Sequence, residues 1–99
     1  MGQISSTLNK GFNITFENGL TISVQFGCGN YCSNRFESIS DPLTEAIISC
    51  NNAEIAIWDE NKKWFNFGSD EVKGYCTSDE VAKWISKTQR AKNIKTIRK

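Results

Sequence analysis

Apolar and polar side chains alternate along residues 12–26. A period of two is typical of half-buried β-strands. The dipeptide Asn18-Gly19 interrupts the alternation and is a common turn signal. The pattern therefore predicts an antiparallel hairpin with seven apolar residues on one face: Phe12, Ile14, Phe16, Leu20, Ile22, Val24 and Phe26.

The length of this turn follows from the need to keep the apolar side chains together. A two-residue loop would pair Ile14 with Ser23, which sets the apolar face of one strand against the polar face of the other. A three-residue loop of residues 17–19 pairs Ile14 with Ile22 instead. It also places Gly19 at the left-handed position that such a loop needs. We therefore expect the three-residue loop.

A second hairpin is predicted for residues 53–67, because residues 53–58 and 64–67 both alternate. Contacts between side chains that lie opposite each other on the two segments favour this pairing. One face belongs to the core, and the other exposes two tryptophans. A loop centred on Asn61 gives four cross-strand pairs: Ile57 with Phe65, Ile55 with Phe67, Trp58 with Trp64, and Asp59 with Lys63.

The segment between the hairpins is less regular. Residues 27–40 have the composition of a loop. Asp41 and Pro42 suit the start of a short helix, and residues 43–50 fit either that helix or a strand. Residues 72–76 predict a short final strand.

The end of the chain predicts an amphipathic helix. Thr77 and Glu80 have the spacing of a capping box. The helix would carry an apolar stripe of Val81, Trp84, Ile85 and Thr88, and an opposite basic stripe of Lys83, Lys87 and Arg90. Ile94 and Ile97 do not continue the apolar stripe, so we expect the packed part to end near Lys92 and the remainder to fray.

Together these elements predict an α+β fold. A small antiparallel sheet of two hairpins plus a short strand would have the C-terminal amphipathic helix packed on one face. With 99 residues the chain is expected to form a single domain, 1–99. Its ordered core would cover about residues 10–92, followed by a frayed basic end, residues 93–99.

The net charge of +1 conceals an asymmetry. Residues 1–80 carry a net charge of −6, whereas residues 81–99 carry +7 and no acidic residue. The near-zero total excludes a uniformly basic nucleic-acid binder and a uniformly acidic mimic of DNA. The basic end is either a solvated helix face or an arm that meets phosphate or an acidic partner. Surfaces of opposite sign also allow head-to-tail association into a homo-oligomer.

The residue types present argue against catalysis and against a metal site. The chain has no histidine, which removes the commonest general base near neutral pH. Of the four cysteines only Cys28 and Cys32 form a close pair, whereas a thiolate zinc site usually needs two such pairs. We therefore expect no catalytic residues, no metal and no cofactor, and we expect reduced thiols that pack as small hydrophobic groups.

Loop and aromatic residues are the candidates for a ligand site. The glycine-rich segment 27–32 follows a strand but lacks the lysine and serine or threonine of a phosphate-binding P-loop. Its backbone amides could still face an anion, and aromatic rings could stack on a base. The alternative is that the glycines only permit a tight turn and the rings only pack the core. The candidate ligand-binding residues are Gly29, Asn30, Tyr31, Arg35, Trp58, Trp64 and Tyr75.

Four short segments resemble a family of small uncharacterised bacteriophage proteins. The segments are TISVQFG over residues 21–27, GNYC over 29–32, AEIAIWD over 53–59, and VKGY over 72–75 with DEV at 79–81. The resemblance covers roughly residues 11–86 and implies a phage accessory protein in the cytoplasm of the infected bacterial host. The polar start of the chain and the lack of a long apolar run agree with this location and with no membrane partner.

Small phage accessory proteins commonly counter host defence. The sequence therefore predicts a non-enzymatic protein that binds and sequesters a nucleotide-derived immune signal. The alternatives are a direct protein inhibitor of a host defence complex, similar to anti-CRISPR proteins, and a structural or interaction protein of the phage. The expected partner is a nucleotide-like small molecule or a host defence protein, and nucleic acid is not expected except at the basic tail.

Overall fold

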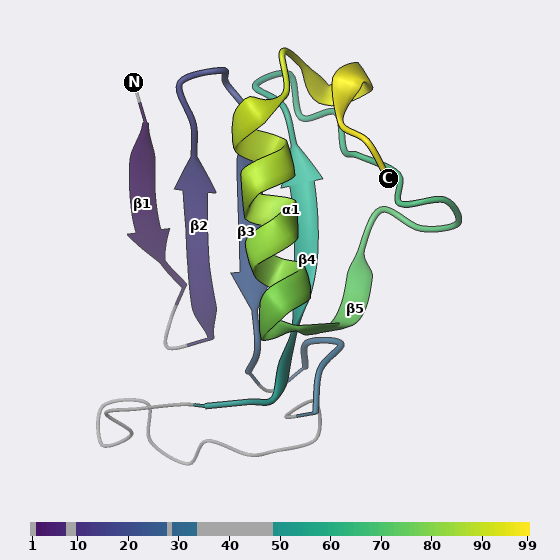
Figure 1. Ribbon diagram of the computed structural model, residues 1–99. Coiled ribbons are helices and arrows are strands. Elements are labelled where there is room, and N and C mark those ends of the chain that lie inside the picture. The colour runs from purple at the N-terminus through teal and green to yellow at the C-terminus, as the bar shows by residue number, and fades with distance from the viewer. Residues whose placement is uncertain (1, 8–9, 28, 34–48) are drawn as a thin grey trace.

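A computed structural model describes residues 2–7, 10–27, 29–33 and 49–99 of the chain. The predictions for Cys28, for Arg35, for a helix starting at Asp41 and for most of residues 43–50 lie outside this range. The described residues form one antiparallel sheet, in the strand order β1-β2-β3-β4-β5, and one α-helix that follows the last strand (Figure 1). The elements are β1 (Gln3–Ser6), β2 (Gly11–Thr15), β3 (Thr21–Gln25), β4 (Asn52–Trp58), β5 (Lys73–Thr77), α1 (Ser78–Arg90) and the 3₁₀ turn η1 (Ile94–Thr96). The α+β class is therefore confirmed.

The hairpin of β2 and β3 has the three-residue loop that its alternation predicts. Ile14 pairs with Ile22, and the Phe16 amide donates to the Leu20 carbonyl at 2.9 Å. Gly19 has a φ of +88°, in the left-handed region that glycine adopts without penalty. The register places the apolar residues of both strands on one side of the sheet.

The second hairpin is only partly present. Trp58 and Trp64 form an isolated bridge, and the Phe65 amide donates to the Ile57 carbonyl at 2.8 Å. Residues 64–67 do not continue as a strand, and the predicted pair of Ile55 with Phe67 is wrong. The reason is competition for one edge of β4, because β5 pairs there and places Lys73 opposite Ile55.

Strand β1 is a further difference from the prediction, which began the ordered core near residue 10. Its four residues pair with β2 at the edge of the sheet, and all four are exposed. The short sequence Gln-Ile-Ser-Ser contains one large apolar residue, Ile4, which is 76% exposed. An edge strand without a buried face has no alternation that sequence analysis can detect.

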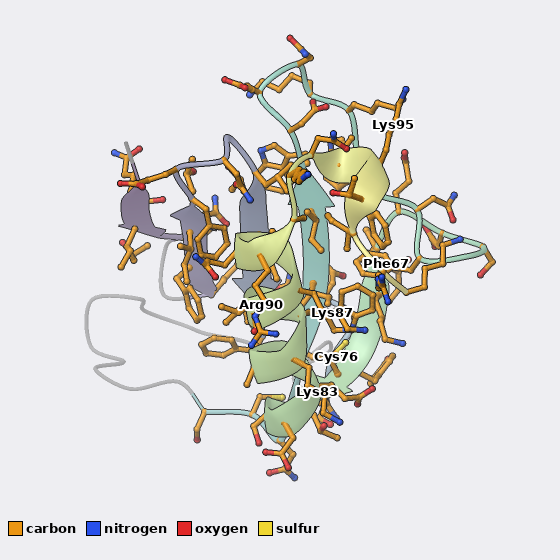
Figure 2. The ribbon with its side chains drawn as sticks, turned by 45° about the horizontal axis from the view of Figure 1, so that its top comes forward. Phe67, Cys76, Lys83, Lys87, Arg90 and Lys95 are labelled. Atoms are coloured by element: carbon orange, nitrogen blue, oxygen red, sulfur yellow. The ribbon has the colours of Figure 1, made fainter. Side chains whose placement is uncertain are left out.

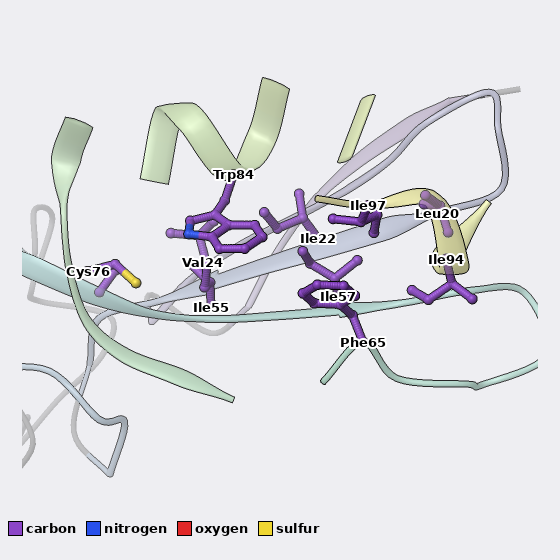
Figure 3. Close-up of a cluster of buried hydrophobic side chains, with 11 residues drawn as sticks. Leu20, Ile22, Val24, Ile55, Ile57, Phe65, Cys76, Trp84, Ile94 and Ile97 are labelled. Carbon is purple, nitrogen blue, oxygen red and sulfur yellow. The ribbon is translucent and has the colours of Figure 1, made fainter. Parts of the chain in front are cut away.

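Helix α1 covers one face of the sheet, over β3 and β4 (Figure 1). Its capping box is present as predicted: the Glu80 amide donates to the Thr77 hydroxyl at 3.2 Å, and the Thr77 amide donates to the Glu80 carboxylate at 3.0 Å. Trp84 projects from α1 onto the strands (Figure 3), and its ring also contacts the rings of Phe65 and Phe67. The hydrophobic core lies in this layer between helix and sheet.

The end of the chain packs against this core. Ile94 and Ile97 are each 7% exposed and lie among the core side chains beside Leu20 and Ile57 (Figure 3). The expectation that these two isoleucines leave the packed part of the molecule is wrong. The physical reason is that α1 stops at Arg90 and the chain turns, so the helical period no longer decides which residues face inward.

Candidate functional site

The face of the sheet that points away from α1 carries mostly uncharged polar side chains. In β3 these are Thr21, Ser23 and Gln25, which alternate with the core residues and are nearly buried. The Gln25 side-chain amide donates to the Ser23 hydroxyl at 3.0 Å. In β2 the Oδ1 of Asn13 is buried without a hydrogen-bond partner. This face is therefore rich in hydrogen-bonding groups, and Trp58 provides an aromatic ring at one end of it.

Trp58 and Trp64 stack on each other, with ring centroids 5.1 Å apart and planes inclined by 29°. Trp64 is 40% exposed. Beside Trp58 the hydroxyls of Thr15 and Thr21 lie 2.8 Å apart, within hydrogen-bond distance. A hollow of about 310 Å³ lies here, lined by Thr15, Phe16, Glu17, Asn18, Gly19, Thr21, Trp58, Asp59, Glu60 and Lys62. We call it the tryptophan hollow.

The tryptophan hollow is more acidic than basic. Three carboxylates and the single cation of Lys62 line it. One of the carboxylates holds the local turn, since Asp59 accepts the main-chain amides of Asn61 and Lys63 at 2.9 Å each. Glu17 and Glu60 remain to set the local charge. Such surroundings suit hydroxyl and amino groups better than phosphate.

Tyr31 and Tyr75 form a second exposed aromatic pair. The Tyr75 amide donates to the Tyr31 carbonyl at 2.8 Å, and the two side chains are 44% and 53% exposed. The Tyr31 amide donates to the Glu54 carboxylate at 2.8 Å, which fixes the loop against β4. Tyr75 has a φ of +55°, an uncommon backbone conformation for a bulky residue. Its ring is therefore held outward at some conformational cost.

Six of the seven predicted ligand residues are described, all except Arg35, and the structure does not bring these six into one site. Trp58 and Glu54, the contact of Tyr31, are four residues apart along β4, a separation of about 13 Å. Asn30 has a local role, because its Oδ1 accepts the Gly27 amide at 3.1 Å, and Gly29 occupies the turn between them with a φ of +86°. The two aromatic pairs are thus separate candidates.

A third feature, which the sequence did not predict, is a hollow in which three of the six lining residues are basic. Its volume is about 310 Å³. One wall is the last turn of α1 and the other is the end of the chain, which the burial of Ile97 brings back to the helix. The absence of acid from residues 81–99 was the available signal, but it did not show that the end of the chain folds back. The residues lining this basic hollow are Ser86, Lys87, Arg90, Ala91, Thr96 and Arg98.

Cys76 is a free cysteine. It is 1% exposed in the core, and this burial raises its pKa to about 11. The thiol is therefore protonated at neutral pH and a poor nucleophile or metal ligand. Within the described part of the chain, no group of three or more cysteine, aspartate or glutamate side chains is placed to hold a metal ion. No helix in this part is long and apolar enough to cross a membrane.

Comparison with protein-family models, with curated proteins and with solved structures found no match to this chain. The likeness to small bacteriophage proteins therefore stays a prediction from the sequence motifs.

Proposed function

We propose that the protein is a non-catalytic binding protein that sequesters a nucleotide-derived ligand, and that the tryptophan hollow takes the nucleoside part of that ligand. The observation that carries this proposal is the combination of groups around one hollow. An indole ring, a pair of threonine hydroxyls and carboxylates lie together beside the polar sheet face. These are the groups that a base and a ribose need.

Each group has a separate task in the proposed complex. The indole of Trp58 stacks on the base, a contact worth about 1–3 kcal/mol. The Thr15 and Thr21 hydroxyls keep unused hydrogen-bonding capacity after their mutual bond, because each hydroxyl has one donor and two acceptor positions. The Glu60 carboxylate accepts hydrogen bonds from ribose hydroxyls. The phosphate stays outside, near Lys62.

Sequestration rather than turnover agrees with the residue types in the chain. With no histidine present, the general base commonest near neutral pH is missing. In an infected bacterium, a protein that holds a nucleotide-derived immune signal without cleaving it would counter host defence by mass action. This setting comes from the motif resemblance, whereas the ligand class comes from the hollow.

A ligand panel tests the proposal. The full chain is mixed with adenosine, its monophosphate, cyclic dinucleotides and cyclic ADP-ribose isomers, and the melting temperature and the tryptophan fluorescence are measured. At least one compound is expected to raise the melting temperature. After heat denaturation that compound should be recovered intact. A cleaved ligand would show an enzyme and overturn the non-catalytic assignment.

Matched variants locate the site. Trp58→Ala is expected to weaken binding about tenfold or more, as the loss of a stacked base implies. Tyr75→Ala removes an exposed ring from the other aromatic pair and should leave ligand affinity unchanged. An equal loss of ligand affinity in both variants would contradict the tryptophan hollow as the site. The same holds if only phosphate-bearing compounds bind and Trp58→Ala still binds them.

The Tyr31 and Tyr75 pair favours a second candidate, direct inhibition of a host defence protein. Exposed tyrosines are typical hot-spot residues of protein interfaces. If this candidate is correct, the double variant Tyr31→Ala with Tyr75→Ala loses capture of a purified defence complex, and Trp58→Ala keeps it. The opposite pattern excludes it.

A further inference from the structure

The basic hollow concentrates positive charge at the end of α1. Three cations, Lys87, Arg90 and Arg98, line a space of about 310 Å³. None of the lining residues is acidic, and neither is any residue from 81 to 99. Clustered like charges repel each other, and a bound anion would relieve this repulsion.

Packing fixes the backbone beside Arg98. Its neighbour Ile97 is buried in the core at 7% exposure, and the exposed side chain of Arg98 lines the hollow. The turn before it is held by Thr96, whose hydroxyl accepts the main-chain amides of Lys92 and Asn93 at 3.0 and 3.1 Å. The segment that carries Arg98 is therefore held by packing and by hydrogen bonds.

Helix capping does not explain the cations on α1. Positive side chains near a helix C-terminus often interact with the last carbonyls. Here the side-chain amide of Asn18 donates to the carbonyls of Thr88 at 2.9 Å and Ala91 at 2.8 Å. Lys87 is engaged elsewhere, with its ammonium 4.6 Å from the centre of the Trp84 ring. Arg90 and Arg98 remain exposed at the surface.

The basic stripe continues along the helix beyond the hollow, where the Thr77 hydrogen bonds and, to a lesser extent, the charge of Lys83 lower the pKa of Glu80. Lys83 lies one turn before Lys87, and Arg90 lies about one turn after it, along α1 (Figure 2). At 1.5 Å rise per residue these cations span about 10 Å of the helix axis. A ligand that meets all of them carries several negative charges in a row. Guanidinium groups bind phosphate with two parallel hydrogen bonds, which favours phosphate among such ligands.

We propose that the basic hollow and the adjoining stripe bind the phosphates of a nucleic-acid strand. Arg90 and Arg98 hold one phosphate in the hollow, with Lys87 beside them. Lys83 meets a further phosphate along α1. Since no nucleobase contact is needed, binding depends on charge and is independent of sequence. This surface and the tryptophan hollow have no lining residue in common, so either assignment can fail without the other.

Salt titration of oligonucleotide binding tests this proposal. Fluorescence anisotropy of a labelled 12-nucleotide single strand and of its duplex is measured with the full chain from 50 to 200 mM salt. With three to four phosphates neutralised, log K is expected to fall against log salt with a slope of about −2 to −3 for the single strand. Two oligonucleotides of unrelated sequence should give the same affinity.

Charge-matched variants decide whether the hollow is responsible. Arg98→Gln and Arg90→Gln should each reduce the slope by about 0.7 and weaken binding severalfold at low salt. Lys63→Gln changes the net charge equally at an exposed position in the turn after β4, and it should behave like the wild type. Melting curves of all three variants show whether the fold is retained.

Four outcomes would overturn the proposal. The first is no strand binding at 50 mM salt. The second is an equal effect of Lys63→Gln and Arg98→Gln, which would mean only the overall charge matters. The third is equal affinity for a polyglutamate peptide of the same charge, which would assign the surface to an acidic protein. A single nucleotide that binds as tightly as the strand would also exclude the extended site.

Discussion

At the scale of single residues, Asn18 connects two parts of the fold that are far apart in sequence. Its side-chain amide donates to the carbonyls of Thr88 and Ala91, with a longer contact of 3.3 Å to Gln89. Its Oδ1 accepts the Leu20 amide at 3.0 Å. The last carbonyls of a helix have no partner within the helix, so this one side chain performs the task of a C-terminal cap.

Replacing this amide by a carboxylate tests its role. Asn18→Asp keeps the acceptor for Leu20 but removes the donors, and it adds negative charge at the negative end of the helix dipole. We expect a loss of about 1–3 kcal/mol in the free energy of unfolding, measured by urea denaturation. Asn66→Asp is the matched control, because Asn66 only accepts the Gly68 amide, a role that aspartate keeps. Equal stability of both variants would contradict the capping role.

Gly19 and Gly29 illustrate two reasons why a position needs glycine, namely a left-handed backbone conformation and a lack of space for a Cβ atom. Their φ angles are +88° and +86°, but a Cβ on Gly19 would lie 2.7 Å from the Glu60 carboxylate, whereas a Cβ on Gly29 meets nothing within 4 Å. We expect alanine at either position to cost about 1 kcal/mol for the backbone conformation, and valine at Gly19 to cost more. Thermal unfolding of Gly19→Ala, alone and with Glu60→Ala, measures the contribution of the contact. If Gly19→Val melts like the wild type, the three-residue loop is not required.

The Cys76 thiol makes stability depend on pH at the alkaline end. Its pKa is raised in the folded state to about 11 by burial, so the folded protein keeps the proton where the unfolded chain has lost it. The thiol's contribution to stability is therefore complete below about pH 9 and is lost as the pH rises toward 11. We expect the denaturation midpoint of Cys76→Ala to fall less steeply over this interval than that of the wild type. Parallel curves would show that Cys76 does not titrate there.

At the scale of elements, local signals predicted what local contacts form. The β2–β3 hairpin could be derived in full because its register depends on one alternation and one glycine within 15 residues. The strand that pairs with β4 on its other side could not be derived, because residues 64–67 and 73–77 both suit that edge of β4. The choice depends on the packing of Phe65 and Phe67 against Trp84, a contact between distant segments.

The start of α1 offers a clean test at this scale. Thr77 accepts the Glu80 amide, and the Glu80 carboxylate accepts the Thr77 amide, which also lowers the pKa of Glu80. Thr77→Ala is expected to cost about 1 kcal/mol, whereas Thr77→Ser keeps the hydroxyl and most of the stability. Urea denaturation of the two variants checks this. A loss of equal size in both would mean that the methyl group, and not the cap, matters.

At the scale of the whole molecule, the sequence identified candidate residues but not their grouping. Tyr31, Trp58, Trp64 and Tyr75 were all predicted as ligand residues, and all four are at least partly exposed. They form two pairs because they lie at opposite ends of β4. The amino-acid composition does not predict this separation. The basic residues were likewise counted correctly, and only the burial of Ile97 shows that Arg98 returns to α1.

The packing of the C-terminal segment is therefore the point on which both the fold and the basic hollow depend. Ile97→Ala removes buried side-chain volume, and we expect a loss of about 2–4 kcal/mol in the free energy of unfolding. Ile4→Ala makes the same chemical change at a residue that is 76% exposed, and it should change stability by less than about 0.5 kcal/mol.

The same pair of variants also tests how packing is coupled to charge. Ile97→Ala alters no charge, yet it frees Arg98 from the helix and should lower the slope of strand binding against salt, measured at a temperature where the variant remains folded. Ile4→Ala should leave that slope unchanged. If Ile97→Ala destabilised the protein and strand binding were unaffected, Arg98 would not need its fixed position. A frayed end of the chain would give no loss of stability in either variant.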